Sequence, residues 1–475
     1  MTVLSILRIA ATLAAASLLL AGRPLHALAR ASSAPAHLGS AAQGEPAAER
    51  PTSSRLSLRG AVVAAQAHYP TIAAAEANRD AAASAVGEAK AARWPALRLT
   101  GAATRYEEPM LVTPIHAFQV DALPPFNETI LQGTLNASWT LFDGWARGAR
   151  IDAASRQRDA SESALTATEQ DLVLRVVRAY LHVLTSAQVL EAQDQRLTAL
   201  TAERERAARL LAAGRAAEVE VLRAEAARAS AEAERIRLAA LLDIAQHDLA
   251  RVAGMAPERV QRAPLVAVAL RDTTSPDRAT LHEAARAASP FLQQSRQRLA
   301  ASAAQAQVAR GRRWPQLDLF GNSIGWSDAD GHDALEWNAG AQLVYPIFTG
   351  GAISKGIDKA DALQTASQEA VRIDEIQVEQ EIDRALARTV ETHARVRSLR
   401  TAVERYIEVV RIERLSLDAG SGTQTDYLRA EADLLEARAG LVEAQHGEMA
   451  ARAELARVTG ELDADWIART LEDRP

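Results

Sequence analysis

The chain has 475 residues and no cysteine, so disulfide bonds, thiol catalysis and thiolate metal sites are excluded. Its net charge is −6, and because acidic and basic residues are interleaved along it, no nucleic-acid partner is expected. Aromatic residues make up only 4 %, whereas Ala, Glu, Arg and Leu dominate, a composition typical of long helices and coiled coils.

The first 29 residues are predicted to be a secretory signal peptide. A weakly basic start at Arg8 precedes an apolar run over residues 9–21, and Ala27-Leu28-Ala29 supplies small residues for cleavage. At about 13 residues the run is too short for a helix that crosses a bilayer, and no later stretch is long enough either. Residues 30–54 predict a flexible leader, and without a cysteine no lipid anchor is expected at the mature N-terminus.

The first repeat is predicted to begin with a helix and two strands. The helix covers residues 56–93, with a break near Pro70 because proline cannot continue a helix. Apolar and polar residues then alternate over 97–104 and over 135–141, which predicts two strands. The prolines between them predict a long surface loop over 106–131.

A long helical hairpin is predicted to follow. No proline interrupts residues 148–213, and two neighbouring apolar seams at a spacing near 3.5 residues predict a helix that packs against a partner on each side. Gly214 ends this helix, and residues 219–252 are expected to return antiparallel to it. Two seams suit a cylinder of helices better than a two-stranded coil. The charge run over 203–206 is interpreted as a solvated helix face.

The second half repeats this order. Its predicted elements are a helix over 278–312, strands over 317–324 and 338–345, and a hairpin of helices over 354–418 and 425–458. The predicted boundaries are a signal peptide (1–29), a leader (30–54), a first repeat (55–254), a linker (255–277), a second repeat (278–460) and a C-terminal tail (461–475).

Two motifs mark the duplication. Arg93-Trp94-Pro95 recurs as Arg313-Trp314-Pro315 at an offset of 220 residues, and Phe142-Asp143-Gly144 recurs as Phe348-Thr349-Gly350 at 206 residues. The offset changes by 14 residues between the two motifs, and insertions collect in exposed loops. We therefore expect the first repeat to carry the longer loop between its strands.

The predicted strands are long enough to cross a bilayer when tilted. One face of each is mostly apolar and the other polar, the pattern of an outer-membrane barrel around a wet lumen; a soluble hairpin with one wet face is the alternative. Four strands cannot close a barrel, and an open edge in lipid leaves backbone groups unpaired, so copies of the chain must pool their strands. Two, three or four copies all remain open. Tryptophans near the strand ends fit a membrane interface: Trp94, Trp314, Trp326 and Trp337.

In this arrangement the chain resembles the TolC-like outer-membrane efflux family over nearly its whole mature length. The resemblance rests on Leu56-Ser57-Leu58-Arg59, on the duplicated motifs above, and on the hairpin signatures Leu222-Arg223-Ala224-Glu225 and Leu428-Arg429-Ala430-Glu431. It implies a mainly α fold with a small β part, in which long antiparallel coiled-coil helices form an α-barrel tunnel. It also implies a homotrimer whose four strands per chain make a 12-stranded barrel.

The resemblance implies partners and sites as well. The expected partners are outer-membrane lipid, a periplasmic adaptor protein and, through it, an inner-membrane pump; no cofactor is expected. The hairpin ends are expected to dock the adaptor, through Gly214, Val221, Leu222, Gly420, Gly422, Tyr427 and Leu428. A periplasmic gate is expected at Asp426 and Arg429, as charged rings that pair within or between chains. The barrel–tunnel junction is expected at Trp94, Pro95, Gly144, Trp314, Pro315 and Gly350.

Simpler interpretations stand beside these sites: the glycines are helix breakers, and Asp426 and Arg429 lie on a solvated face. No catalytic or metal site is expected, because His282-Glu283 lacks the second histidine of a zinc-protease motif. The acidic turn over 328–333 resembles a calcium loop, but its glycine comes too early, so a polar turn is expected. The function expected is a passive exit duct for small molecules. The alternatives are the outer-membrane part of a type I protein secretion system and a periplasmic coiled-coil scaffold without a pore.

Overall fold

A computed structural model describes residues 55–112, 124–271 and 277–474. The signal peptide, the leader and part of the first inter-strand loop lie outside these residues. The chain divides into two compact units. A strand unit contains Trp94–Phe142 and Gln316–Val344, and a helical unit contains Pro51–Arg93, Asp143–Pro315 and Tyr345–Pro475.

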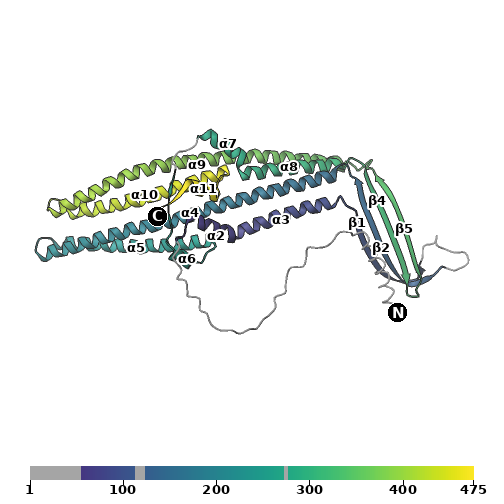
Figure 1. Ribbon diagram of the computed structural model, residues 1–475, viewed down its shortest axis with the longest axis horizontal. Coiled ribbons are helices and arrows are strands. Elements are labelled where there is room, and N and C mark those ends of the chain that lie inside the picture. The colour runs from purple at the N-terminus through teal and green to yellow at the C-terminus, as the bar shows by residue number, and fades with distance from the viewer. Residues whose placement is uncertain (1–54, 113–123, 272–276, 475) are drawn as a thin grey trace, which may run out of the picture. The chain divides into compact units, whose positions relative to one another are not determined.

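The strand unit is one antiparallel sheet, with the order β1-β2-β4-β5 (Figure 1). Its strands are β1 (Ala96–Leu111), β2 (Phe126–Phe142), β4 (Gln316–Asp328) and β5 (Asp333–Val344). The central pair, β2 with β4, joins the two repeats. Among the described residues, β1 and β5 each pair with one strand, so each leaves one edge of backbone groups unpaired.

All four predicted strands are confirmed, but the expectation of a loop from residue 106 is wrong. β1 continues through Pro109 to Leu111. Its pairing register with β2 shifts between Arg105 and Met110, and β1 is an edge strand. Proline lacks a backbone N–H, which an edge strand can spare at such an irregularity. The loop of the first repeat is still the longer one, as predicted, since β4 and β5 are separated only by residues 329–332.

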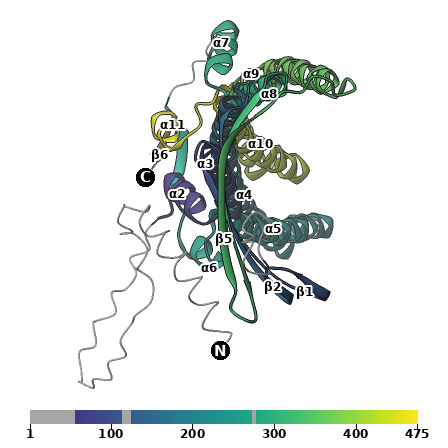
Figure 2. The same ribbon diagram turned by 90° about the vertical axis from the view of Figure 1, so that its right-hand side faces the viewer.

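The helical unit is built on two long hairpins. One is α4 (Ala146–Ala212) with α5 (Glu218–Ala253), and the other is α9 (Ala352–Asp418) with α10 (Gln424–Thr459). These bounds lie within two residues of the predicted ones. α4 and α9 have 67 residues each, which gives a length of about 100 Å. Within the unit the helices follow one another in a curved layer, in the order α5, α4, α10 and α9 (Figure 2).

A broken helix precedes the strands in each repeat. The first is α2 (Leu58–His68) and α3 (Pro70–Ala91), and the second is α7 (Arg278–Ala288) and α8 (Pro290–Gly311). The break at Pro70 is confirmed. A single helix over 278–312 is wrong, because Pro290 starts α8 and Ser289 before it is not helical. Proline suits the first helical position, where its missing N–H has no partner to lose.

The linker and the tail contain structure that the sequence did not predict. The linker holds α6 (Pro257–Arg262) and β3 (Ala267–Leu270), and the tail holds α11 (Ala464–Thr470) and β6 (Leu471–Arg474). β3 and β6 pair antiparallel. Residues 461–474 are therefore folded back onto the middle of the chain.

The main core of the helical unit surrounds Tyr180 on α4, which is fully buried. Its hydroxyl lies 2.8 Å from the carbonyl oxygen of Leu56 and 2.7 Å from that of Val266. Leu58 and Leu249, each at most 1 % exposed, belong to the same cluster. The buried hydroxyl thus ties the start of the first repeat to the linker.

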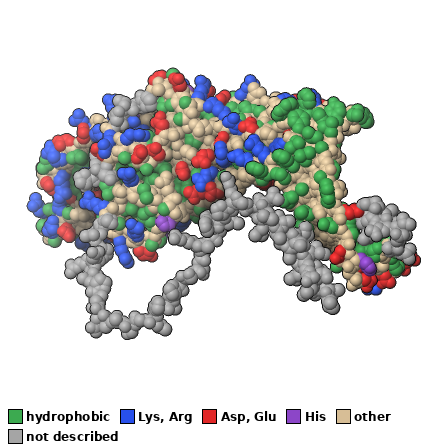
Figure 3. All heavy atoms as spheres, turned by 45° about the vertical axis from the view of Figure 1, so that its right-hand side comes forward, with side chains coloured by type: hydrophobic (Ala, Val, Ile, Leu, Met, Phe, Trp, Pro, Cys, Tyr) green, Lys and Arg blue, Asp and Glu red, His purple; other side chains and the backbone are tan. Residues whose placement is uncertain are grey.

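Figure 3 shows basic and acidic side chains interleaved over the surface of the helical unit. A separate part of the same face carries mostly hydrophobic side chains. Within the described residues, no helix has both the length and the apolarity that a membrane span requires.

Candidate functional site

The candidate site is the end of the helical unit where both long hairpins reverse direction. α4 ends at Ala212 and α9 at Asp418, and each is followed by a glycine in the left-handed conformation, Gly214 with φ 67° and Gly420 with φ 76°. The backbone N–H after each glycine bonds back to the last helical turn. A Cβ on either glycine would meet no atom within 4 Å, so the conformation and not the space requires glycine there.

Gly422 is required for a different reason. A Cβ at this position would lie 2.9 Å from Cβ of Ser416 and 3.1 Å from the backbone nitrogen of Leu417. Any side chain would therefore force the reversal apart. The second hairpin end is accordingly the more tightly folded of the two.

Helix α10 begins with a reciprocal cap. The Thr423 hydroxyl oxygen accepts from the backbone N–H of Asp426 at 3.2 Å, and the same hydroxyl donates to Oδ2 of Asp426 at 2.6 Å. A carboxylate in the first turn also interacts favourably with the positive end of the helix dipole. At the start of α5, the capping residue Ala217 has no side-chain cap.

A chain of polar contacts joins the two hairpins near these ends. Glu203 on α4 is completely buried, and Nε2 of Gln424 on α10 donates to its Oε1 at 3.0 Å. Nε of Arg206 donates to Oε2 of the same carboxylate at 3.0 Å, and Nη1 of Arg206 lies 4.0 Å from Oδ1 of Asp418 on α9. The interpretation of residues 203–206 as a solvated face is therefore wrong for Glu203.

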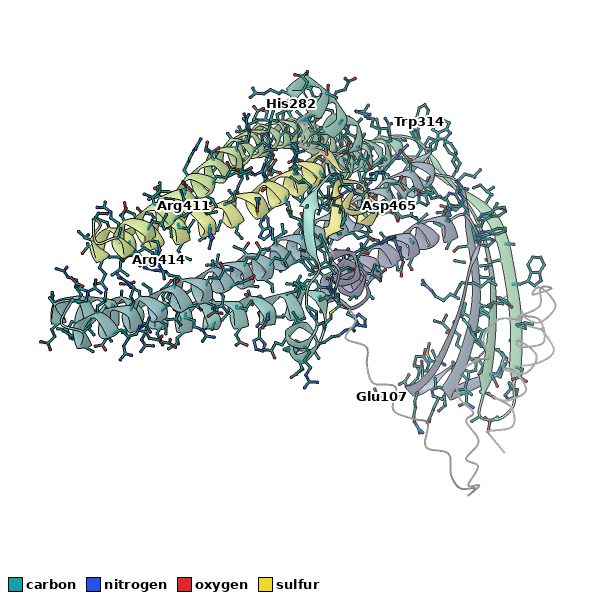
Figure 4. All side chains as sticks on the ribbon, turned by 60° about the vertical axis from the view of Figure 1, so that its left-hand side comes forward. Glu107, His282, Trp314, Arg411, Arg414 and Asp465 are labelled. Atoms are coloured by element: carbon teal, nitrogen blue, oxygen red, sulfur yellow. The ribbon has the colours of Figure 1, made fainter. Side chains whose placement is uncertain are left out.

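The contacts continue along α9 and α10. Arg414 lies 3.9 Å from Asp418 and donates to the hydroxyl of Tyr427 at 3.1 Å, with its guanidinium 5.4 Å from the ring centroid (Figure 4). The Tyr427 hydroxyl in turn donates to Glu431 at 2.9 Å. Burial, together with the charge of Glu431, raises the pKa of Tyr427 to about 12, so the ring stays neutral.

The predicted gate residues occupy exposed positions. Asp426 is held by Thr423, and no ion pair joins it to Arg429 among the described residues. Pairing of the two within one chain is thus not formed, because the cap already engages the carboxylate. Both side chains remain exposed, as rings between chains would require.

The predicted docking residues divide into two groups. Leu222 is 56 % exposed, and Val221 and Leu428 are partly exposed. Tyr427 is 1 % exposed and packs inside its own chain, so in this conformation it presents no surface to an adaptor. Its polar contacts lie within the second hairpin, to Arg414 on α9 and Glu431 on α10.

Sequence reasoning missed the buried polar contacts, although a signal was present. At the offset of 206 residues, Arg414 and Asp418 correspond to Ala208 and Ala212. Polar residues that replace alanine in one copy of a duplicated hairpin indicate a contact made by that copy alone. The missed residues are Glu203, Arg206, Arg414, Asp418, Gln424 and Glu431.

Five of the six predicted junction residues lie at the bounds of the two units, whereas Gly350 lies six residues after Val344. The division falls before Trp94, after Phe142 and after Pro315, within one or two residues of Pro95, Gly144 and Trp314. Gly144 has φ 67°, and a Cβ on it would lie 2.3 Å from the carbonyl oxygen of Gly311. Gly350 also has a positive φ, 60°, but has space for a side chain.

The acidic turn over 328–333 is a polar turn, as predicted. Oδ1 of Asp328 accepts from the backbone N–H groups of Asp330 and His332, at 3.0 and 2.9 Å, and Oδ2 lies 2.8 Å from Nδ1 of His332. The carboxylate is thus used by its own turn. In the part of the chain that the structure describes, no three His, Cys, Asp or Glu side chains come together in a way that would hold a metal ion.

Comparison with known proteins identifies the fold and the family. The protease secretion protein PrtF of Dickeya chrysanthemi is 25 % identical over 369 residues, which cover 75 % of this chain and 78 % of PrtF. The protein CyaE of Bordetella pertussis is 31 % identical over 49 % of this chain and 50 % of its own length. The crystal structure of the outer membrane protein VceC from Vibrio cholerae superposes with a TM-score of 0.72, at 22 % identity, over 85 % of this chain and 96 % of VceC, a likeness of fold.

The family model described as outer membrane efflux protein matches residues 61–255 and 281–461, which is most of the chain. The repeated order of broken helix, strand pair and long hairpin is the architecture expected from the TolC-like resemblance. A periplasmic scaffold without a pore is excluded by this match. The chain therefore belongs to the outer membrane efflux protein family and is an outer-membrane channel, not an enzyme.

Proposed function

We propose that this protein is the outer-membrane exit duct of a tripartite efflux system. It works as a homotrimer and receives small molecules from an inner-membrane pump through a periplasmic adaptor. The observation that carries the proposal is the pair of unpaired sheet edges, on β1 and β5. In lipid such edges cost several kcal/mol per unpaired group, so each must find the edge of another copy. Three copies would supply twelve strands.

The curved layer of long helices supports the same assembly. α5 and α9 stand at its two ends, and both carry exposed apolar side chains, among them Ile236 and Ile244 on α5 and Ile407 and Ile412 on α9. Copies that meet through these faces would close the layer into a tunnel. Disulfide crosslinking of cysteines introduced on α5 and α9 should give covalent trimers. Dimers that exclude a third copy would overturn the stoichiometry.

Cargo is tested in a host that lacks its own channel. We expect the chain, with an adaptor and a proton-driven pump, to restore resistance to small toxic compounds. We also expect its N-terminus to be cleaved near Ala29, which sequencing of the mature protein checks. Failure to restore resistance with any adaptor that binds it would remove the efflux assignment.

Type I protein secretion is the second candidate, and one observation favours it. PrtF, whose name refers to protease secretion, is similar along 78 % of its length. In the same host, an adaptor and a transport ATPase would then export a protein substrate through this channel. Export of protein without small-molecule resistance would replace the first proposal by the second.

The hairpin ends are proposed as the gate and the docking surface. Asp426 and Arg429 would form two charged rings in a trimer, and exposed Leu222 and partly exposed Leu428 would meet the adaptor. Asp426→Asn with Arg429→Gln removes both charges, while the amide keeps an acceptor for the Thr423 cap. We expect a higher single-channel conductance in planar bilayers. Unchanged conductance and ion selectivity would reject the rings.

A further inference from the structure

The opposite end of the helical unit, where α8 ends and α4 begins, carries a cavity that two tryptophans line. The cavity holds about 460 Å³. Trp145 and Trp314 line it, with ring centroids 5.7 Å apart and planes at 90°, and Gly148 and Gly311 contribute no side chains to it. Trp314 lies just beyond the end of α8 (Figure 4). Arg310 on α8 lines the same cavity.

Apolar side chains at this end are unusually exposed. Trp145 is 68 % and Trp314 54 % exposed, and Ile347 and Phe348, which precede α9, are each 89 % exposed. Trp145 also has a φ of 65°, the only positive value outside glycine in the described residues. Large apolar surface of this kind on a folded protein marks contact with a membrane or a partner.

Basic side chains surround the same end. Arg310, Arg312 and Arg313 lie within five residues that contain no acid. Arg310 is paired with Asp361 on α9 at 2.8 Å. Arg312 and Arg313 are exposed and make no ion pair with the residues that the structure describes. Their charges are therefore available to an anion.

Chain continuity places these residues next to the membrane strands. β2 ends at Phe142, three residues before Trp145, and β4 begins at Gln316, two residues after Trp314. β5 ends at Val344, three residues before Ile347. In an outer-membrane channel, residues that follow directly on the strands lie at headgroup depth, where tryptophan and arginine are favoured.

We propose that this end of the helical unit binds an anionic glycerophospholipid of the periplasmic leaflet. The phosphate lies against Arg312 and Arg313, and the glycerol and upper acyl chains lie against Trp145 and Trp314. The proposal rests on the outer-membrane placement of the chain and not on its cargo. It extends the expected interfacial role of Trp314 to a site with a defined ligand.

Full-length protein in detergent, titrated with dioleoyl phosphatidylglycerol or dioleoyl phosphatidylcholine and followed by native mass spectrometry, tests the site. We expect tighter retention of phosphatidylglycerol. Arg312→Gln with Arg313→Gln should weaken its binding on the order of thirtyfold, since each basic residue near a lipid surface contributes about a factor of five. Phosphatidylcholine binding should weaken much less, because the choline cation already offsets the charge of its phosphate.

Arg397→Gln with Arg400→Gln is the matched control, because both residues are exposed on α9 in the same unit. Trp145→Gly should weaken both lipids alike without lowering thermal stability, since glycine tolerates the positive φ. Equal loss in the control, or no loss in the Arg312 and Arg313 variant, would overturn the site. Displacement of phosphatidylglycerol by inorganic phosphate would overturn the lipid as the ligand, because it would show that phosphate alone is recognised. The Arg312 and Arg313 variant should conduct normally in planar bilayers. A wild-type protein that does not conduct would contradict the proposed exit duct and not the lipid site.

Discussion

The two long hairpins reverse direction in the same way but differ in what surrounds the reversal. Arg414, Asp418 and Tyr427 of the second hairpin correspond, at the offset of 206 residues, to Ala208, Ala212 and Val221 of the first. The second end therefore carries a helix cap and a buried tyrosine that the first end lacks, and its Gln424 and Asp418 contact Glu203 and Arg206 on α4. The two copies keep the same backbone course but differ in their side chains. The polar side chains of the second end contact the first end.

This asymmetry predicts which contacts keep the hairpins together. At the positions of Arg414, Asp418 and Tyr427 the first hairpin has alanine or valine, which cannot make these contacts. Substitutions that make the second end resemble the first should therefore destabilise the hairpin end, and those that copy the second end into the first should stabilise it.

The largest effect is expected from Glu203→Ala. The change leaves Arg206 and Gln424 without their shared buried acceptor, which costs about 2–3 kcal/mol of stability. The channel should also conduct better, because α10 is no longer held by α4. Thermal unfolding and planar-bilayer recordings measure the two effects.

Glu205→Ala is the control for this variant. Glu205 is on the same helix, but its side chain is 57 % exposed and lies 3.9 Å from Arg209. An exposed pair of this kind contributes at most about 0.5 kcal/mol. Equal losses for the two glutamates would show that burial of Glu203 has no consequence.

Arg414→Ala and Tyr427→Val convert the second end toward the first. Separately each should destabilise the hairpin, Tyr427→Val by about 2 kcal/mol since a fully buried ring is truncated. Together they should cost less than the sum, by about 1 kcal/mol, because each removes the same hydrogen bond and cation–π contact. A double-mutant cycle by chemical denaturation gives the coupling, and strictly additive losses would contradict the contact.

His446 on α10 predicts a pH effect that the first repeat lacks, since its counterpart is Ala240. Burial lowers the pKa of His446 from 6.5 to about 4. Its Nδ1 lies 2.7 Å from the Thr185 hydroxyl, which itself donates to the carbonyl oxygen of Leu181, so the ring is neutral and donates to threonine. The folded state thus stays unprotonated at pH values where the unfolded state is protonated.

The sign follows from this difference. The contribution of His446 is complete above about pH 6.5 and is lost as the pH falls toward 4, by up to about 3 kcal/mol. His446→Gln should flatten the stability profile in that window. His247→Gln, at a more exposed histidine on α5, is the control for the same substitution elsewhere in the unit. If the wild-type protein and His446→Gln lost the same stability between pH 6.5 and 4, the burial of His446 would be contradicted.

The sequence predicted the long helices within two residues because their signals are local. The apolar seams, Gly214 and Gly420 act over a few residues along the chain. The pairing of β3 with β6 and the contact of Glu203 with Gln424 join residues about 200 positions apart. The sequence next to each of these residues is typical of a solvated helix face or a loop. Comparison of one repeat with the other points to Arg414 and Asp418, which correspond to alanines, but not to Glu203 or to the β3–β6 pair.

The smallest predicted effect copies a feature from the second end into the first. Thr423 caps α10 with Asp426 three residues later, whereas α5 starts after Ala217 with Glu220 at the corresponding position. Ala217→Thr would complete the same threonine-to-acid cap, in which the hydroxyl accepts from the N–H of Glu220. The expected gain is about 0.5–1 kcal/mol, seen as a higher thermal midpoint, and Ala216→Thr, one residue before the cap, should give none. If Ala217→Thr and Ala216→Thr stabilised the protein equally, the gain would not come from the cap. The two hairpin ends would then differ in their packing and not in how α5 and α10 begin.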